Sequence, residues 1–307
     1  MHTPRMRPPP PFVLSPDELT KKIKEWAKPK PLYTLDKLHA THALRFDWTG
    51  WLSEDAQFPA STPTVVRGLA PLWQQDGLRL EQHKPRGNTL QILCRTEPHV
   101  SPTLFAKCVK GRLQHAFRQA GTPVKFSRKV AVRTLGENVS AAVAGYLGKQ
   151  VRKEGFVDPR YVKRLQDFTV IRDDVDLSQP AASHSGRYWY NLHLVLVVGD
   201  RCRIQDYAML GKMRDGTFQI AQAKGYAVKS VAVMPDHLHV ALRGNISHSP
   251  ADTAFAFLNN LAYMLGRFRI WQNHYYAGTF SEYGLDVIRK ISRQSSSPAA
   301  QGRRGRC

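Results

Sequence analysis

The sequence predicts an α+β protein built from two tandem copies of one strand-and-helix unit. Two observations predict this class: a strand–turn–helix segment recurs later in the chain at a constant offset, and a second pair of matching segments follows it. With 307 residues, 42% of them hydrophobic, the chain has room for two globular domains. We expect a Pro-rich basic N-terminal segment (1–29), a first copy (30–150), a connector (151–186), a second copy (187–295) and a basic tail (296–307).

The clearest repeat is a strand, a turn and a helix, which spans Asn88–Phe117 in the first copy and Asp236–Leu265 in the second. Every residue of the second segment lies 148 positions after its counterpart in the first. Alternating apolar residues predict a half-buried strand at the start of each segment. The pairs Ser101–Pro102 and Ser249–Pro250 then predict a helix N-cap followed by a first-turn proline.

A second match lies downstream, between Lys129–Gln150 and His274–Gln294. Both segments have a short strand, which contains Thr134 or Thr279, then a turn and a helix that ends in Gln. The offset falls from 145 residues at the threonines to 144 at the glutamines, as a one-residue deletion in the second copy would produce. Duplication explains both matches better than chance similarity of two ordinary units.

The charge of the chain favours a polyanionic partner. Lys and Arg number 45 against 24 Asp and Glu, a formal net charge of +21, and the basic residues are spread through the chain. Such an excess attracts nucleic acid over a long range, although it also serves solubility. The four cysteines form no zinc-binding pattern, no apolar run is long enough to cross a membrane, and the N-terminus lacks a secretory signal. We expect a cytoplasmic, nucleoid-associated protein.

The sharpest motif is MPDHLHVAL, Met234–Leu242, in which His237 and His239 stand two residues apart on a predicted strand. Both imidazoles therefore project from one face of the strand. Two neutral imidazoles on a rigid face can chelate a divalent ion, which polarises a phosphate oxygen. The alternative for an arbitrary His-x-His is a pair of surface histidines on a half-exposed strand.

This motif resembles the HUH motif of the IS200/IS605-like (Y1) tyrosine transposases. Trp189–Val198 (WYNLHLVLVV) resembles the first strand of that family, and Trp271–Thr279 (WQNHYYAGT) resembles its approach to the catalytic helix. In the first copy, TLGENVSAAVAGYLGKQ resembles the catalytic helix itself, with Tyr146 and Gln150 in the Tyr-x-x-x-Gln pattern. The resemblance implies that each copy is a small antiparallel sheet with helices on one face, in a ferredoxin-like arrangement.

The two copies lack complementary parts of that pattern. The second copy keeps His237 and His239, but its helix has Lys290 or Ile291 in place of the tyrosine. The first copy keeps the tyrosine helix but has Thr89 and Gln91 at the histidine positions. Neither copy alone can be an active enzyme of this type.

The resemblance implies one composite site, because dimers of the family place the tyrosine helix of one subunit against the HUH strand of the other. Tyr146 would attack a single-stranded DNA phosphodiester and become linked to the 5′ phosphate. His237, His239 and Gln150 would hold Mg²⁺ or Mn²⁺ against that phosphate. Asp236 is expected to shape the entry to the strand rather than to bind metal.

The expected partner is single-stranded DNA with hairpin ends, bound to an intramolecular pseudo-dimer that can assemble further. Basic and aromatic residues near the repeat helices are the candidates for DNA contact, although a solvated helix face explains them nearly as well: Lys107, Lys110, Arg112, Arg267, Arg269 and Trp271. One tyrosine fits nicking and rejoining more easily than full transposition. The alternatives are a catalytically inactive, domesticated DNA-hairpin-binding protein or repressor, and an RNA-binding accessory protein.

Overall fold

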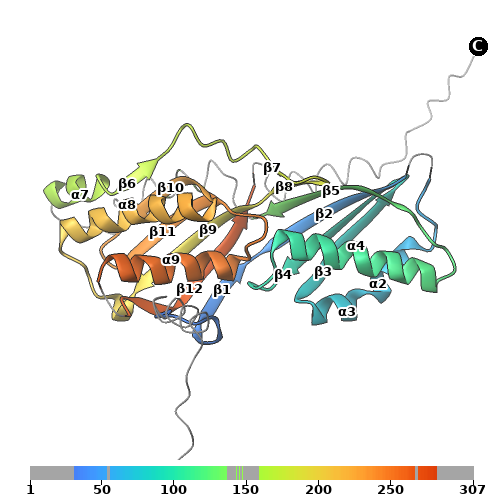
Figure 1. Cartoon of the computed structure of the whole chain (residues 1–307), viewed down its shortest axis with the longest axis horizontal. Coiled ribbons are helices and arrows are strands. Elements are labelled where there is room, and N and C mark those ends of the chain that lie inside the picture. Colours follow the sequence, from blue (N-terminus) through green and yellow to red (C-terminus); the bar gives the residue numbers. More distant parts are fainter. Residues whose placement is uncertain are drawn as a thin grey trace, which may run out of the picture. The chain divides into compact units, whose positions relative to one another are not determined.

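The computed structural model describes residues 31–53, 56–136, 159–266 and 269–281, and also Val143, Gly145 and Leu147 (Figure 1). The chain divides into two compact units, Met1–Leu32 and Tyr33–Cys307, and the description below concerns the second. No helix within the described ranges is long and apolar enough to span a bilayer.

The first sheet contains six strands. Their order across the sheet is β3 (Leu78–Arg86), β4 (Thr89–Thr96), β2 (Arg45–Leu52), β5 (Phe126–Leu135), β8 (Gly186–Trp189) and β7 (Ala181–Ala182). All neighbouring pairs are antiparallel except β5 and β8, which run parallel.

The second sheet also contains six strands. Their order is β1 (His39–Ala43), β12 (Trp271–Phe280), β9 (Asn191–Val198), β11 (His237–Arg243), β10 (Ala227–Val233) and β6 (Thr169–Ile171). Here β1 and β12 form the parallel pair. The α+β class is confirmed, with the correction that each sheet is mixed rather than purely antiparallel.

Four adjacent strands of each sheet have the same order, β5-β2-β4-β3 in the first and β12-β9-β11-β10 in the second. Irregularities also recur at equivalent places. The register of β3 shifts between Leu80 and Gln82, and that of β10 shifts between Val228 and Ser230, 148 residues later. A bulge is a local feature that unrelated sheets have no reason to share, so the matching positions support duplication.

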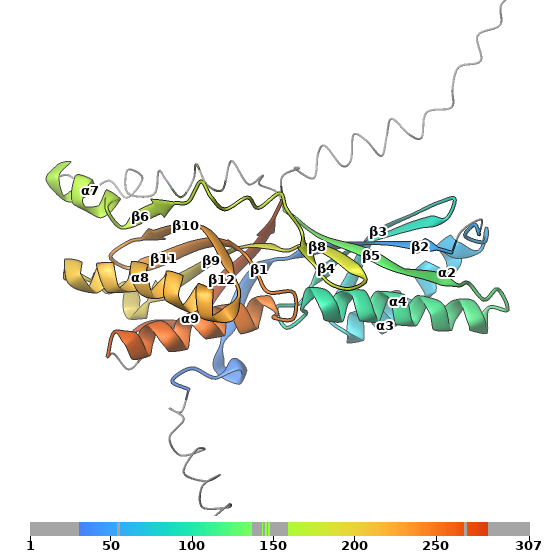
Figure 2. The same cartoon turned by 45° about the horizontal axis from the view of Figure 1, so that its top comes forward.

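Helices cover one face of each sheet (Figure 2). In the first copy they are α2 (Thr62–Gly68), α3 (Ala70–Gln75) and α4 (Pro102–Gln119), and in the second they are α8 (Tyr207–Lys224) and α9 (Pro250–Met264). The other elements are α7 (Pro159–Gln166) and the short 3-10 helices η1 (Leu35–Lys37) and η2 (Gly199–Arg201).

The two long repeat helices begin as the sequence predicts. Ser101 accepts a hydrogen bond from the backbone N–H of Leu104, and Ser249 accepts one from that of Asp252, whose carboxylate completes a capping box. The predicted apolar stripe of α4 is buried from Phe105 to Phe117, and the Phe105 ring meets that of Phe46 on β2 edge-on at 5.5 Å.

The two copies exchange their first strands. β1 continues into β2 through Leu44, yet β1 pairs with β12 of the other copy. In the same way β8 continues into β9 through Tyr190, yet β8 pairs with β5. Both connecting residues are buried, Leu44 at 2% and Tyr190 at 1% exposure. Each sheet is therefore completed by a strand from the other copy.

Candidate active site

His237 and His239 project from the face of β11 opposite to the helices. Both are buried, at 7% and 4% exposure, and their ring centroids lie 4.8 Å apart. The two-residue spacing thus gives a close pair on one face, as strand geometry requires. The alternative of two surface histidines is excluded by this burial.

Asp236 orients the first of these rings. Its Oδ1 lies 2.7 Å from His237 Nδ1, and its Oδ2 accepts a hydrogen bond from Arg201 at 3.1 Å. A carboxylate on Nδ1 fixes the ring orientation and turns Nε2 toward any ligand, which is the usual arrangement behind metal-binding histidines.

His193 is a third histidine on this face, and the sequence reasoning missed it. It lies on β9 with its Nε2 3.1 Å from His239 Nδ1, and the two rings are nearly parallel. The Tyr276 ring lies edge-on to His193 at 5.8 Å. The available signal was a titratable residue in the largely apolar strand Asn191–Val198, in phase with Val195 and Val197 on the half-buried face of that strand.

Two of the three histidines are held neutral. Burial lowers the pKa of His239 to about 2, and the neighbouring His193 and His237 add to the effect. Burial also lowers the pKa of His193 to about 4. A neutral imidazole is the form that ligates a metal ion.

The donor set is incomplete within the described residues. No three His, Cys, Asp or Glu side chains in the described ranges form a group suited to a metal ion. Gln150, the expected third ligand, lies outside those ranges, as do Tyr146, Lys290 and Ile291.

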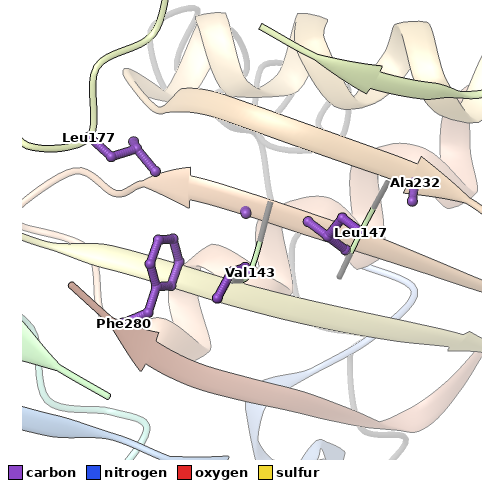
Figure 3. Close-up of a cluster of buried hydrophobic side chains, with 6 residues drawn as sticks. Val143, Leu147, Leu177, Ala232 and Phe280 are labelled. Carbon is purple, nitrogen blue, oxygen red and sulfur yellow. The ribbon is translucent and has the colours of Figure 1, made fainter. Parts of the chain in front are cut away.

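Val143 and Leu147 of the first copy pack on the histidine-bearing face of the second sheet (Figure 3). They are 6% and 0% exposed, whereas Gly145 between them is exposed. Their partners are the side chains of one buried cluster: Leu177, Ala232, Ala241 and Phe280. Ala232 is the register partner of His239 across β10 and β11.

Thr89 and Gln91 occupy the matching register positions in the first sheet. Gln91 lies opposite Thr49 on β2, as His239 lies opposite Val195 on β9. Gln91 is exposed and Thr89 is half-buried, whereas His237 and His239 are both buried. The two faces therefore differ in solvent exposure as well as in residue type.

The predicted DNA-contacting residues of α4 lie on the helix side of the first sheet. Lys107 is exposed. Lys110 donates a hydrogen bond to the backbone carbonyl of Ser127 at 2.7 Å. Arg112 forms a two-pronged ion pair with Asp76 that raises the pKa of the guanidinium, so both of these cations have structural partners.

The candidates near β12 have different surroundings. Arg269 is exposed and has a positive φ of 55°. Trp271 is only 2% exposed, and its backbone N–H donates to the Tyr33 hydroxyl at 2.7 Å. Its ring is therefore a core element rather than a platform for a base. Arg267 lies outside the described residues.

Comparison with known proteins gives matches to one family model and to solved structures. Residues 187–294 match the family model described as "Transposase IS200 like". A crystal structure of a putative transposase from Deinococcus radiodurans R1 matches with 21% identity and a TM-score of 0.28, over 35% of this chain and 92% of that one. No curated protein matches the chain. By this family match, the second copy of the chain is similar to the IS200-like transposases over residues 187–294.

Proposed function

We propose that the chain nicks and rejoins single-stranded DNA at one composite site, where Tyr146 of the first copy acts beside His237 and His239 of the second. The observation that carries this proposal is the burial of Val143 and Leu147 against the histidine-bearing sheet. These two residues flank Tyr146 in the sequence and belong to the copy that lacks the histidines.

Helical spacing supports the same pairing. Val143 and Leu147 are four residues apart and both buried, while Gly145 is exposed, as expected for one face of a helix packed on a sheet. Helical spacing of 3.6 residues per turn predicts that Tyr146 is roughly a quarter turn away from the midpoint of Val143 and Leu147, and that Gln150 is closer to that midpoint.

The chain's own residues have distinct roles in this chemistry. The Tyr146 hydroxyl is the nucleophile: its oxygen bonds to the phosphorus, the bond from phosphorus to the 3′ oxygen breaks, and the DNA strand leaves with a free 3′-OH. A DNA 3′-OH reverses the step by attacking the phosphotyrosine, because one phosphodiester bond replaces another. Asp236 and His193 hold the rings of His237 and His239 through their Nδ1 atoms. Burial keeps His239 neutral at physiological pH.

The two histidines suit a divalent cation, Mg²⁺ or Mn²⁺, with Gln150 as a third ligand. Buried imidazoles with oriented Nδ1 atoms are the observation that fits such an ion. Such an ion would neutralise negative charge that develops on the attacked phosphate.

The test is formation of a covalent adduct. The full-length protein is incubated with end-labelled single-stranded hairpin DNA and Mn²⁺, and the products are separated on a denaturing gel. We expect an adduct with the wild-type chain that is lost in Tyr146→Phe and in His237→Ala. Tyr263→Phe, which alters an exposed tyrosine of α9, is the matched control and keeps the adduct.

An adduct that persists in Tyr146→Phe would refute the assignment of the nucleophile. Strong binding of hairpin DNA with no adduct on any substrate would instead support the alternative function, a catalytically inactive hairpin-binding protein or repressor. The charge of +21 is equally compatible with that alternative, so only a covalent product separates the two.

A further inference from the structure

A groove of about 2010 Å³ lies on the helix-free face of the first sheet, at the place that corresponds to the histidine-bearing face of the second. It is lined by residues of β2, β3, β4 and β5, including Thr89 and Gln91 on the face away from the helices, and by β8 and the segment before it. Among the described residues, the face that carries Thr89 and Gln91 is therefore lined as a groove.

Cations have replaced small or uncharged residues on this face. Lys84 is the register partner of Gln91, whereas the equivalent partner of His239 in the second sheet is Ala232. Arg133 on β5 is equivalent to Gly278 on β12. Arg187 on β8 is equivalent to Thr41 on β1, since Arg187 pairs with Ala131 and Thr41 pairs with Tyr276. A helix that packs on Ala232 would bury a charged amine if it packed in the same way on Lys84, which is costly.

The described lining is strongly basic. Its described residues include five Lys and Arg side chains, namely Lys84, Arg86, Lys129, Arg133 and Arg187, against two carboxylates. One carboxylate, Glu81, is engaged by Arg45 and Arg95. The other, Asp47, is partly buried beside Arg133, and burial raises its pKa to about 6. The groove thus has an excess of positive charge directed at its contents.

Two tryptophans flank the cations. Trp51 and Trp189 both line the groove and are half-buried. The Arg133 guanidinium lies 4.0 Å above the Trp189 ring, a cation–π contact that holds it within the groove. Cations that follow a phosphate backbone, together with aromatic rings on which bases stack, are the combination that binds single-stranded nucleic acid.

We propose that this groove, the decayed active-site face of the first copy, binds single-stranded DNA and delivers it to the composite site. The proposal rests on the proposed function for the identity of the DNA as substrate. Its path is supported by Leu177, which lines the groove and also belongs to the cluster with Val143 and Leu147 beside His239. One end of the groove therefore reaches the nucleophile-bearing segment.

The experiment compares two triple variants in a Tyr146→Phe background without Mn²⁺, so that binding is measured apart from cleavage. The groove variant replaces the exposed Arg86, Lys129 and Arg187 by Ala. The control variant replaces three exposed helix-side cations by Ala: Arg118, Lys212 and Lys224. Fluorescence anisotropy follows the binding of labelled single strands over a range of salt concentrations.

We expect the groove variant to bind a long single strand at least tenfold more weakly, with the slope of log K against log salt reduced by about 2, as three lost phosphate contacts imply. The control variant keeps the wild-type slope. Stacking on Trp51 predicts quenching of tryptophan fluorescence by DNA, smaller in Trp51→Leu.

Equal losses in the two triple variants would overturn the proposal, because the effect would then be one of net charge. An unchanged salt slope in the groove variant would overturn it as well. RNA of the same sequence that binds at least tenfold more tightly than DNA would assign the groove to RNA instead. Absence of any adduct refutes the proposed nicking activity but leaves the binding comparison intact.

Discussion

Thr134 and Thr279 make equivalent hydrogen bonds, each into the other copy. Thr134 Oγ1 accepts from the backbone N–H of Asn191 at 3.0 Å, and Thr279 Oγ1 accepts from that of Arg45, also at 3.0 Å. Each hydroxyl also lies within donating distance of a carbonyl at the end of the other copy's last strand. The two threonines are the equivalent pair of the second sequence repeat, and they mark where the copies join.

Loss of either hydroxyl should weaken this junction. Thr134→Val and Thr279→Val keep the side-chain shape but leave a buried backbone N–H without its acceptor, so each should lower the free energy of unfolding by about 1–3 kcal/mol. Urea denaturation measures the change. Thr→Ser at the same positions keeps the hydroxyl and should cost less. Valine variants as stable as wild type would contradict this role.

Gly136 and Gly111 should respond to alanine in opposite directions. A Cβ on Gly136 would lie 2.0 Å from the Thr279 carbonyl oxygen, a backbone atom that cannot move aside, so Gly136→Ala should destabilise by roughly 1–3 kcal/mol. Gly111 lies inside α4 with nothing within 4 Å of a new Cβ, and Gly111→Ala should stabilise by about 0.5–1 kcal/mol. Thermal unfolding of both variants measures these two changes in stability. A neutral Gly136→Ala would show that the junction is looser than this contact implies.

Asp47 should make stability depend on pH. Burial raises its pKa from 3.8 to about 6, against the opposing effects of Arg133 and a Thr49 hydrogen bond. Between these values the folded protein retains a proton that the unfolded chain has lost, so stability falls as pH rises through this window and stays lower above it. Asp47→Asn should match wild type near pH 4 and exceed it by roughly 1–3 kcal/mol at pH 7. Urea titrations across this range that keep the wild-type slope in the variant would refute the assignment.

Asp236 should act on metal affinity rather than on the chemical step. Asp236→Asn removes the charge beside His237 Nδ1, and loss of such a partner typically weakens metal binding 10–100-fold. We expect adduct formation to need correspondingly more Mn²⁺ but to reach the wild-type rate at saturation. Arg201→Ala, which removes a largely exposed partner of the same carboxylate, should shift the Mn²⁺ requirement much less. A lowered rate at saturating Mn²⁺ would contradict a purely positioning role.

The sequence alone determined the local features of this protein. Alternation of apolar residues located β4 and β11, the Ser-Pro pairs located the starts of α4 and α9, and the spacing of His237 and His239 placed both on one face. These features depend on residues close together in the chain, where backbone geometry and side-chain period decide the outcome. The constant offset also anticipated the matching strand order of the two sheets.

Only the tertiary structure decided which residues meet across the copies. The exchange of β1 and β8 follows from long-range pairing that no local pattern encodes, since each strand is continuous in sequence with one sheet and hydrogen-bonded to the other. The contact of His193 with His239 requires the register of β9 against β11, and the burial of Trp271 depends on Tyr33, far away in the sequence. A period of two places a side chain on a face of its strand. Its neighbours on that face are set by packing among distant segments.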